Sequence, residues 1–309
     1  MRCATFTLVL ALAAGAAAQE ERVIFETDSL YHHIIVSETS ETRILRFHKG
    51  PAKEAVGIDF AQSVISLADP YTLHMQYSKY AMAGAALVEK PKRVLFVGLG
   101  AGTLPKFFAR AFPDCQVDCA ELDAKVFEAA KRFFFLSDMP NLSVTIMDGR
   151  KFVRKAENKY DIVFLDAYRD NMIPFHLLTK EFLEELKAKL NPNAVVVSNI
   201  AIETDAQLYP WVLRTYQNAF GTLLEVNVPG TINRVIVGKV EKSAAAPADL
   251  VKKSKALQSV VTLGYDLAAC AGLYTDASTR QPSKNILTDN YAPVNLMRIR
   301  KADEKDWEY

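Results

Sequence analysis

"RVLFVGLGAGTLPKFF", residues 93–108, sets the fold class of this chain. An apolar segment leads into Gly98, Gly100 and Gly102, and the apolar spacing after these glycines is that of a helix. Glycine at such a turn permits positive φ and lets backbone amides approach a ligand closely. The stretch predicts a strand, a ligand-binding loop and a helix, although the loop alone also fits a tight turn without a ligand.

Strands and helices alternate after this loop. Helical patterns, for example at residues 124–136 and 179–190, separate short apolar segments. Short apolar strands that alternate with helices indicate a mostly parallel α/β sheet, Rossmann-like, with helices on both faces. Two further strands, residues 223–228 and 234–240, predict a hairpin at one edge of the sheet. The five predicted parallel strands are residues 93–97, 116–121, 143–147, 161–166 and 194–200.

The segment before the loop predicts a separate small structure. "YHHIIVSET" from residue 31 and "TRILRFHKG" from residue 42 have the composition of two strands of a hairpin. Residues 69–89 predict a helix, with Asp69 and Pro70 at the cap and first-turn positions. We therefore divide the chain into four parts: a signal peptide (1–18), an N-terminal β-hairpin region (19–70), an α/β domain (71–240) and a C-terminal helical extension and tail (241–309).

Residues 1–18 have the pattern of a secretory signal peptide. Arg2 gives a positive start, residues 5–14 are an apolar run too short for a membrane span, and three alanines end at Ala18. Cleavage near Ala18 predicts a secreted or periplasmic protein with no membrane span in the mature chain. The 37 basic residues nearly balance the 36 acidic residues, so charge gives no reason to expect a nucleic-acid partner.

Acidic residues follow three of the predicted strands. Glu121 ends the second strand, Asp148 and Gly149 follow the third, and Asp166 ends the fourth. Open α/β sheets bind ligands at the carboxyl ends of their strands, where Glu121 can accept hydrogen bonds from a ribose diol. Three acidic groups suit a nucleoside with a positive charge, as in S-adenosylmethionine, and would repel a pyrophosphate. The alternative interpretation is that these side chains only cap the helices that follow.

Four stretches carry a family resemblance: residues 94–108, 119–134, 146–154 and 160–197. Together they resemble the spermidine synthase-like group of the class I methyltransferase fold. The resemblance covers about residues 31–240, and the tail segment "LTDNYAPVN" also resembles bacterial members.

The resemblance implies a donor, an acceptor and three residue roles. The donor would be S-adenosylmethionine or decarboxylated S-adenosylmethionine, and the acceptor a small amine or polyamine, or a peptide amine. Glu121 would hold the ribose and Asp148 the adenine amine. Asp166 would be catalytic, because an ammonium group must lose a proton before its nitrogen attacks the sulfonium carbon.

Several acceptor positions depart from the family pattern. Ala101 stands where the family has an aspartate, and Leu73 and Met75 stand where it has a tyrosine and a glutamate. A buried polyamine dication without these groups would be poorly compensated. Tyr71, Tyr77 and Asp170 are the residues that we expect to substitute for them. The lost acidic groups favour methyl transfer over the aminopropyl transfer that the family implies.

Two other function classes stay open at this stage. A non-catalytic secreted protein could keep the fold for nucleoside binding or for a structural role, and a dehydrogenase is a more distant alternative. His176 fits a hydrogen-bonded loop residue better than a catalytic one. The five histidines form no metal-ligand cluster, and the residues are compatible with a homodimer.

Overall fold

The computed structural model begins with a small antiparallel sheet of order β1-β2-β3-β4. The structure describes residues 20–47, 61–136, 139–168, 173–201, 208–241, 247–280 and 283–291, so the predicted signal peptide lies outside the described residues. The predicted hairpin is confirmed as β2 and β3, the two central strands of this sheet. The four strands are β1 Arg22–Asp28, β2 His33–Glu38, β3 Thr42–Phe47 and β4 Ala61–Ser66.

The second sheet contains the strands predicted around the glycine loop. Its order is β12-β10-β11-β9-β8-β5-β6-β7, and the five strands from β9 to β7 are parallel. The mostly parallel α/β architecture is thus confirmed, and β10 and β11 form the predicted antiparallel hairpin. The bounds are β5 Arg93–Val97, β6 Gln116–Glu121, β7 Leu142–Ile146, β8 Tyr160–Leu165, β9 Leu190–Ala201, β10 Thr222–Asn227, β11 Asn233–Lys239 and β12 Thr275–Asp276.

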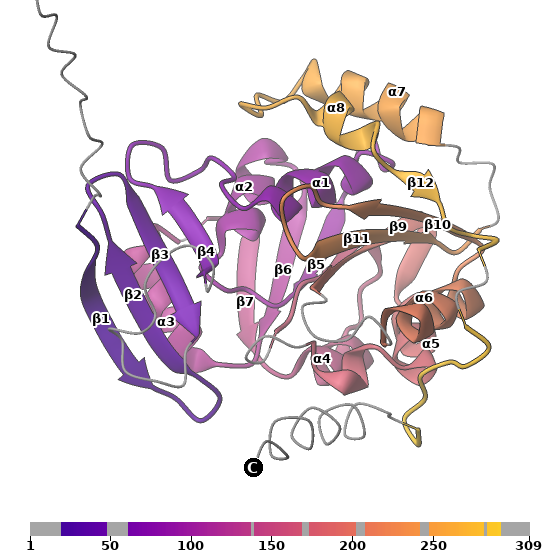
Figure 1. The fold of residues 1–309 in the computed structure, drawn as a ribbon, viewed down its shortest axis with the longest axis horizontal. Helices are drawn as coiled ribbons and strands as arrows, with labels where there is room; N and C mark the ends of the chain where they lie inside the picture. The colour runs from indigo at the N-terminus through magenta and orange to yellow at the C-terminus, as the bar shows by residue number, and fades with distance from the viewer. Residues whose placement is uncertain are drawn as a thin grey trace, which may run out of the picture.

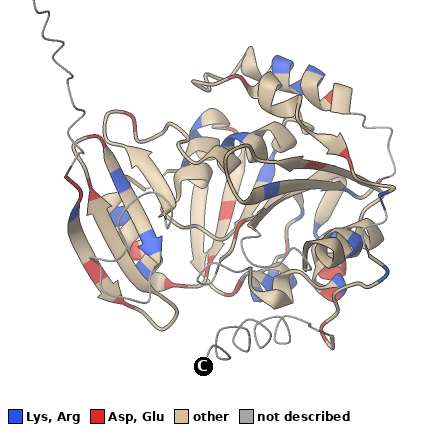
Figure 2. Ribbon diagram, viewed as in Figure 1, with Lys and Arg blue, Asp and Glu red and all other residues tan. Residues whose placement is uncertain are grey.

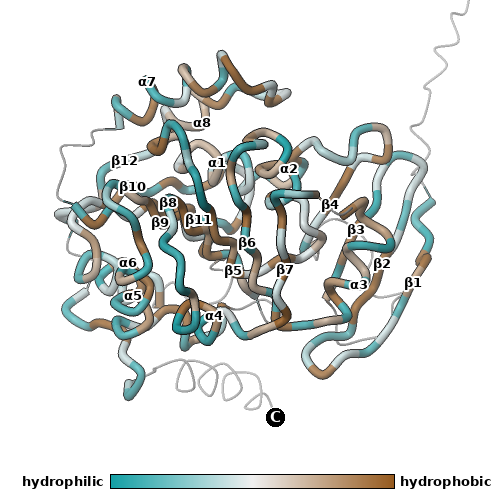
Figure 3. The backbone as a smooth tube through the Cα atoms, turned by 180° about the vertical axis from the view of Figure 1, so that it is seen from behind, coloured by the Kyte–Doolittle hydropathy of each residue, from teal (hydrophilic) through white to brown (hydrophobic). Residues whose placement is uncertain are grey.

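Helices cover both faces of this sheet (Figure 1). Strand residues alternate between two apolar cores: Val94 and Phe96 pack on the side of α1 and α2, and Leu95 packs on the side of α5 and α6. Figure 3 shows the most hydrophobic colours in the central strands. The helices are α1 Gln76–Ala85, α2 Thr103–Ala111, α3 Ala124–Phe133, α4 Gly149–Lys155, α5 Lys180–Lys187, α6 Leu208–Ala219, α7 Pro247–Gln258 and α8 Leu267–Ala271.

Helix α1 begins seven residues later than predicted. The Asp69 carboxylate accepts hydrogen bonds from the Tyr71 amide and the Thr72 hydroxyl, and the Thr72 amide reaches the Asp69 carbonyl. These bonds close a turn instead of starting a helix, because an aspartate side chain serves either structure. The helix starts only at Gln76, so Tyr77 belongs to the helix and Tyr71 belongs to the turn.

The strand order changes direction at the carboxyl ends of β5 and β8. From β5 the chain moves outward through β6 to β7, and it then returns to β8 on the other side of β5. Connections therefore leave the two strands in opposite directions, which is where open α/β sheets bind ligands. The small sheet lies beside α3 at one end of the molecule (Figure 1), and its apolar residues pack against Val126 and Ala129 of that helix.

The C-terminal part adds to the fold at two places. Helices α7 and α8 pack over α1, while β12 pairs with β10. Residues 283–291 return to α4 and α5, where the Asp289 carboxylate accepts hydrogen bonds from the Arg150 guanidinium and the Thr179 hydroxyl. No helix in the described ranges is both long and apolar enough to cross a membrane. Figure 2 shows basic and acidic residues interspersed over the elements.

The Asp289 contacts give a stability prediction. Asp289→Ala removes a bidentate ion pair with Arg150 and the bond from Thr179, so we expect the free energy of unfolding to fall by about 1–2 kcal/mol. The estimate stays low because the Asp289 side chain is 37% exposed and Arg150 keeps its pair with Glu185. Urea titration measures the change. Asp114→Ala, at an exposed carboxylate, is the control and should change stability by less than about 0.5 kcal/mol; equal values for the two variants would contradict the prediction.

Candidate active site

The glycine loop follows β5 in a conformation that requires glycine. Gly98, Gly100 and Gly102 have φ angles of +100°, +55° and +69°. A Cβ atom on Gly98 would lie 2.4 Å from the backbone oxygen of Asp166, a separation at which the backbone must shift. Glycine here thus lets the ends of β5 and β8 meet.

The small sheet contacts this loop directly. The Ala101 amide donates to the Ser63 hydroxyl of β4 at 3.2 Å, and Ala101 is fully buried in the core beneath that sheet. A Cβ atom on Gly100 would lie 3.0 Å from the same hydroxyl oxygen. The N-terminal sheet therefore forms one side of the loop.

Glu121, at the end of β6, fixes the backbone of the loop. Its carboxylate accepts hydrogen bonds from the Leu99 amide at 3.0 Å and the Asp123 amide at 2.8 Å. Burial raises the pKa of Glu121, and these two bonds act in the opposite direction. Each carboxylate oxygen keeps a further lone pair, so the predicted ribose contact is compatible with this bracing.

Asp148 is both a helix cap and a partner of His176. One carboxylate oxygen accepts from the Lys151 amide at 2.9 Å in the first turn of α4, and the other lies 2.8 Å from His176 Nε2. Burial opposes ionisation of Asp148, but these bonds outweigh it and lower its pKa. At Gly149 a Cβ atom would lie 2.3 Å from Val97 Cγ1, so α4 can start this close to β5 only with glycine.

Asp166 joins three elements at the carboxyl edge of the sheet. It follows β8, and its carboxylate accepts hydrogen bonds from the Tyr77 hydroxyl of α1 at 2.8 Å and from the Asn199 amide of β9 at 2.9 Å. Burial raises the pKa of Asp166 to about 6, although both bonds lower it. A carboxylate with such a pKa can bind and release a proton near neutral pH.

The three predicted acceptor residues have different surroundings. Tyr77 hydrogen-bonds to Asp166, whereas the Tyr71 ring faces the Arg110 guanidinium at 4.3 Å and the Lys106 ammonium at 5.2 Å. The Tyr71 ring therefore makes cation–π contacts with two basic side chains of the protein itself. Asp170 lies outside the described residues. Leu73, 1% exposed, belongs to the apolar core.

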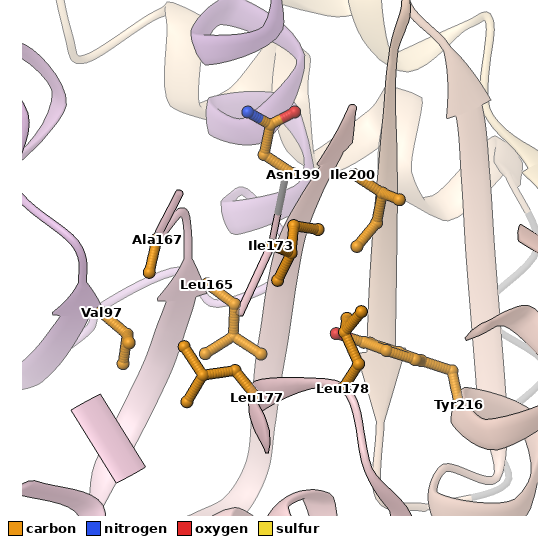
Figure 4. A pocket seen from close by; sticks show the side chains of 9 residues that line it. All are labelled: Val97, Leu165, Ala167, Ile173, Leu177, Leu178, Asn199, Ile200 and Tyr216. Atoms are coloured by element: carbon orange, nitrogen blue, oxygen red, sulfur yellow. The ribbon is translucent and has the colours of Figure 1, made fainter. Parts of the chain in front are cut away.

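A small apolar pocket lies on the α5 and α6 side of the sheet (Figure 4), because all its lining residues except Asn199 belong to or pack against the core on that side. The Asp166 carboxylate, bonded to Tyr77 of α1, faces the other side. The pocket lies at the carboxyl ends of β5, β8 and β9, and the Asn199 amide points away from the other lining side chains. The lining residues are Val97, Leu165, Ala167, Ile173, Leu177, Leu178, Asn199, Ile200 and Tyr216.

Sequence patterns did not single out Ser63, Asn199 or Asn233. The Asn233 amide donates to the Asn199 side-chain oxygen at 2.9 Å, so it belongs to the group around Asp166. Asn199 did carry a signal, since a polar pair interrupts the apolar run "VVVSNI" at the end of β9. Ser63 and Asn233 carried none, because each comes from an element that only the fold brings to this edge. In the described part of the chain no group of His, Cys, Asp or Glu side chains could hold a metal ion.

Residues 74–222 match the family model of the spermine/spermidine synthase domain. The resemblance to the spermidine synthase-like group is confirmed. A polyamine aminopropyltransferase of Vibrio vulnificus is 29% identical over 300 residues, which are 95% of this chain and 97% of that protein. The human eEF1A lysine and N-terminal methyltransferase is 27% identical over 62% of this chain, and the match spans 30% of that protein's length. These relatives support an S-adenosyl-donor alkyl transferase.

Solved structures agree with the spermidine synthase-like fold. A probable spermidine synthase from Corynebacterium glutamicum has a TM-score of 0.68 at 17% identity and covers 87% of this chain and 98% of its own. Human methyltransferase-like protein 13 in complex with SAH has a TM-score of 0.56 at 26% identity and covers 60% of this chain and 92% of its own.

The Glu121 geometry gives a ligand-binding prediction. Glu121→Gln replaces a carboxylate with a neutral amide, so binding of methylthioadenosine should weaken by about 1.5–3 kcal/mol through loss of charged hydrogen bonds to the ribose. Calorimetry measures the affinity. Because Glu121 also holds the backbone of the loop, circular dichroism checks that the variant is folded. Full affinity in a folded variant would remove Glu121 from the ligand site.

The Tyr77 bond gives a prediction about proton affinity. Tyr77→Phe removes a hydrogen bond that favours the charged carboxylate, so the pKa of Asp166 should rise from about 6 by about one further unit. Carboxyl ¹³C NMR follows the titration, with Asp166→Asn assigning the signal. Tyr160→Phe is the matched control, because Tyr160 lies at the opposite end of β8 and its hydroxyl bonds to Asp118 instead. An equal rise in both variants would show that the Tyr77 bond is not the cause.

Proposed function

We propose that this protein transfers an alkyl group from an S-adenosyl sulfonium donor to an amine, with aminopropyl transfer to a small amine or polyamine as the reaction it fits best. The observation that carries the proposal is the Asp166 carboxylate, held beside the glycine loop by Tyr77 and Asn199. A base at that position is the group that an amine acceptor needs.

The neighbouring residues suit an S-adenosyl donor. Glu121 ends β6 with oxygen lone pairs for a ribose diol, and Asp148 follows β7 beside His176 with capacity for an adenine amine. The positive φ angles of the glycine loop leave its amides close to the carboxyl edge of the sheet. The donor would thus lie along the ends of β5, β6 and β7, and its sulfonium would point toward Asp166.

In the proposed reaction Asp166 accepts one proton. A bound ammonium gives that proton to the carboxylate, and the freed nitrogen attacks the carbon attached to the sulfonium. The new C–N bond forms as the C–S bond breaks, and the electron pair of that bond goes to sulfur, which becomes a neutral thioether. Tyr77 and Asn199 hold the carboxylate in place, and such positioning sets the in-line approach.

Support for aminopropyl transfer comes from the extent of the similarity. The Vibrio vulnificus polyamine aminopropyltransferase matches almost end to end, with 95% of this chain and 97% of that protein aligned. We infer that decarboxylated S-adenosylmethionine is the donor in this reaction.

Methyl transfer to a protein amine is the second candidate. Ala101 and Leu73 are buried in apolar cores at positions where the family pattern has an aspartate and a tyrosine, so both lack a group that would bind an aminopropyl or polyamine nitrogen. The 27% identity to a lysine and N-terminal methyltransferase favours the same candidate. The donor would then be S-adenosylmethionine.

The decisive experiment combines a donor comparison with Asp166→Asn. Both S-adenosyl donors are incubated with amines from putrescine to peptide lysines, and we expect turnover with the decarboxylated donor. Asp166→Asn keeps the shape but removes the base, so kcat should fall by about 10²–10⁴-fold while donor affinity stays the same. Mass spectrometry of the products measures both the rate and the group transferred.

Three outcomes separate the candidates. Transfer of a methyl group alone, with Asp166→Asn equally impaired, would replace aminopropyl transfer by the second candidate. Wild-type turnover in Asp166→Asn would remove the catalytic assignment. No binding of either donor or of methylthioadenosine would overturn the proposal in favour of a structural protein that retains the fold.

A further inference from the structure

Two side-chain hydrogen bonds in series connect Asp166 to Asn199 of β9 and Asn233 of β11. Asn199 Nδ2 donates to the Asp166 carboxylate at 2.9 Å, and Asn199 Oδ1 accepts from Asn233 Nδ2 at 2.9 Å. Asn199 is 5% exposed, so its amide has little access to water. Each end of this amide therefore depends on one protein partner.

The sheet places the two asparagines on one face. β9 and β11 are antiparallel, with Asn199 opposite Val235 and Asn233 opposite Ala201. Asn199 and Asn233 are thus diagonal neighbours, at a separation that long side chains bridge. The face is that of Val197 and Val237, which pack in the same core as α1, the helix that carries Tyr77.

A turn holds Asn233 at the start of β11. The Asn233 amide donates to the Thr231 hydroxyl at 3.1 Å, and its carbonyl accepts from the Val228 amide at 3.0 Å. Gly230, with a φ angle of +71°, allows the chain to reverse between β10 and β11. The side chain of Asn233 therefore starts from a backbone fixed by its own loop.

Hydrogen-bond chemistry sets the orientation of the Asn199 side-chain amide. A carboxylate only accepts, so Asn199 must turn its NH₂ group toward Asp166, and its oxygen must then face a donor. We propose that Asn233 is a positioning residue: by donating to Asn199 Oδ1 it keeps the Asn199 NH₂ group on the Asp166 carboxylate. The inference deepens the proposed function, on which it rests for its catalytic meaning, and the geometry itself does not depend on the reaction.

The effect acts on the proton affinity of Asp166. The Asn199 bond lowers the pKa of Asp166 against the larger effect of burial. Two other titratable groups are close: Tyr77 from α1, and Tyr168 on the loop after β8, whose hydroxyl donates to the Asn199 carbonyl. Burial raises the pKa of both phenols well above their ordinary value, so they stay neutral where Asp166 titrates.

The test inverts the polarity at position 233. A carboxylate in Asn233→Asp accepts only, so Asn199 should rotate its NH₂ group toward it and present Oδ1 to Asp166. The pKa of Asp166 in the ligand-free protein should then rise by about one unit, and Asn233→Leu, which removes the donor without inverting it, should raise it by about half as much. Carboxyl ¹³C NMR measures both.

Two controls isolate the role of Asn199. Ile232→Asp adds the same charge on an exposed neighbour and should raise the pKa of Asp166 much less than Asn233→Asp. In an Asn199→Leu background, Asn233→Leu should leave the pKa unchanged, because the amide that connects the two sites is gone. Equal shifts for Asn233→Asp and Ile232→Asp would overturn the inference, as would an effect of Asn233→Leu that survives in the Asn199→Leu background.

A kinetic measurement then connects the position to catalysis. With an acceptor found, Asn233→Asp should lower kcat/KM about tenfold below pH 6 and much less at pH 8, with donor affinity unchanged. A loss that is the same at every pH would indicate a purely structural role and contradict the inference. If Asp166→Asn proves fully active, the catalytic assignment of Asp166 fails, and the NMR titration still decides whether Asn233 orients Asn199.

Discussion

The close approach of Gly98 to the Asp166 backbone sets the arrangement of the site. With a Cβ atom only 2.4 Å from the Asp166 oxygen, any other residue at position 98 would force the ends of β5 and β8 apart. The Asp166 amide donates to the Val97 carbonyl at 2.9 Å, which extends the pairing of the two strands to the base of the loop. The glycine loop and Asp166 are therefore parts of one rigid edge.

The three acidic residues at this edge are adapted to different tasks by their surroundings. Glu121 is buried but receives two backbone amides, Asp148 receives an amide and a histidine, and Asp166 receives a phenol and a side-chain amide. Burial raises the pKa of Asp166 to about 6, because it outweighs the two neutral donors there. In the proposed function, the same side-chain chemistry serves as two binding groups and one base.

The acceptor side is where this chain differs from the pattern it resembles. Ala101 and Leu73 belong to apolar cores, and Ser63 of the small sheet binds the Ala101 amide. The positions that carry an aspartate and a tyrosine in the family pattern thus support packing of the N-terminal sheet and α1. In the proposed function, an extended dication would therefore have fewer compensating groups here than in the family pattern.

Local sequence was enough to specify the sheet, the loop and the acidic residues. The strands β5 and β6 begin and end where the apolar runs predict, because strand ends and glycines are encoded locally. The predicted start of α1 was wrong, since Asp69 and Pro70 fit a turn as well as a cap, and it took the folded chain to show that Tyr77 reaches Asp166 while Tyr71 faces Arg110 and Lys106. Ser63, Asn199 and Asn233 meet this edge from three strands far apart in sequence. Their contacts follow from strand order and register, which are set by long-range packing and leave no local pattern in the chain.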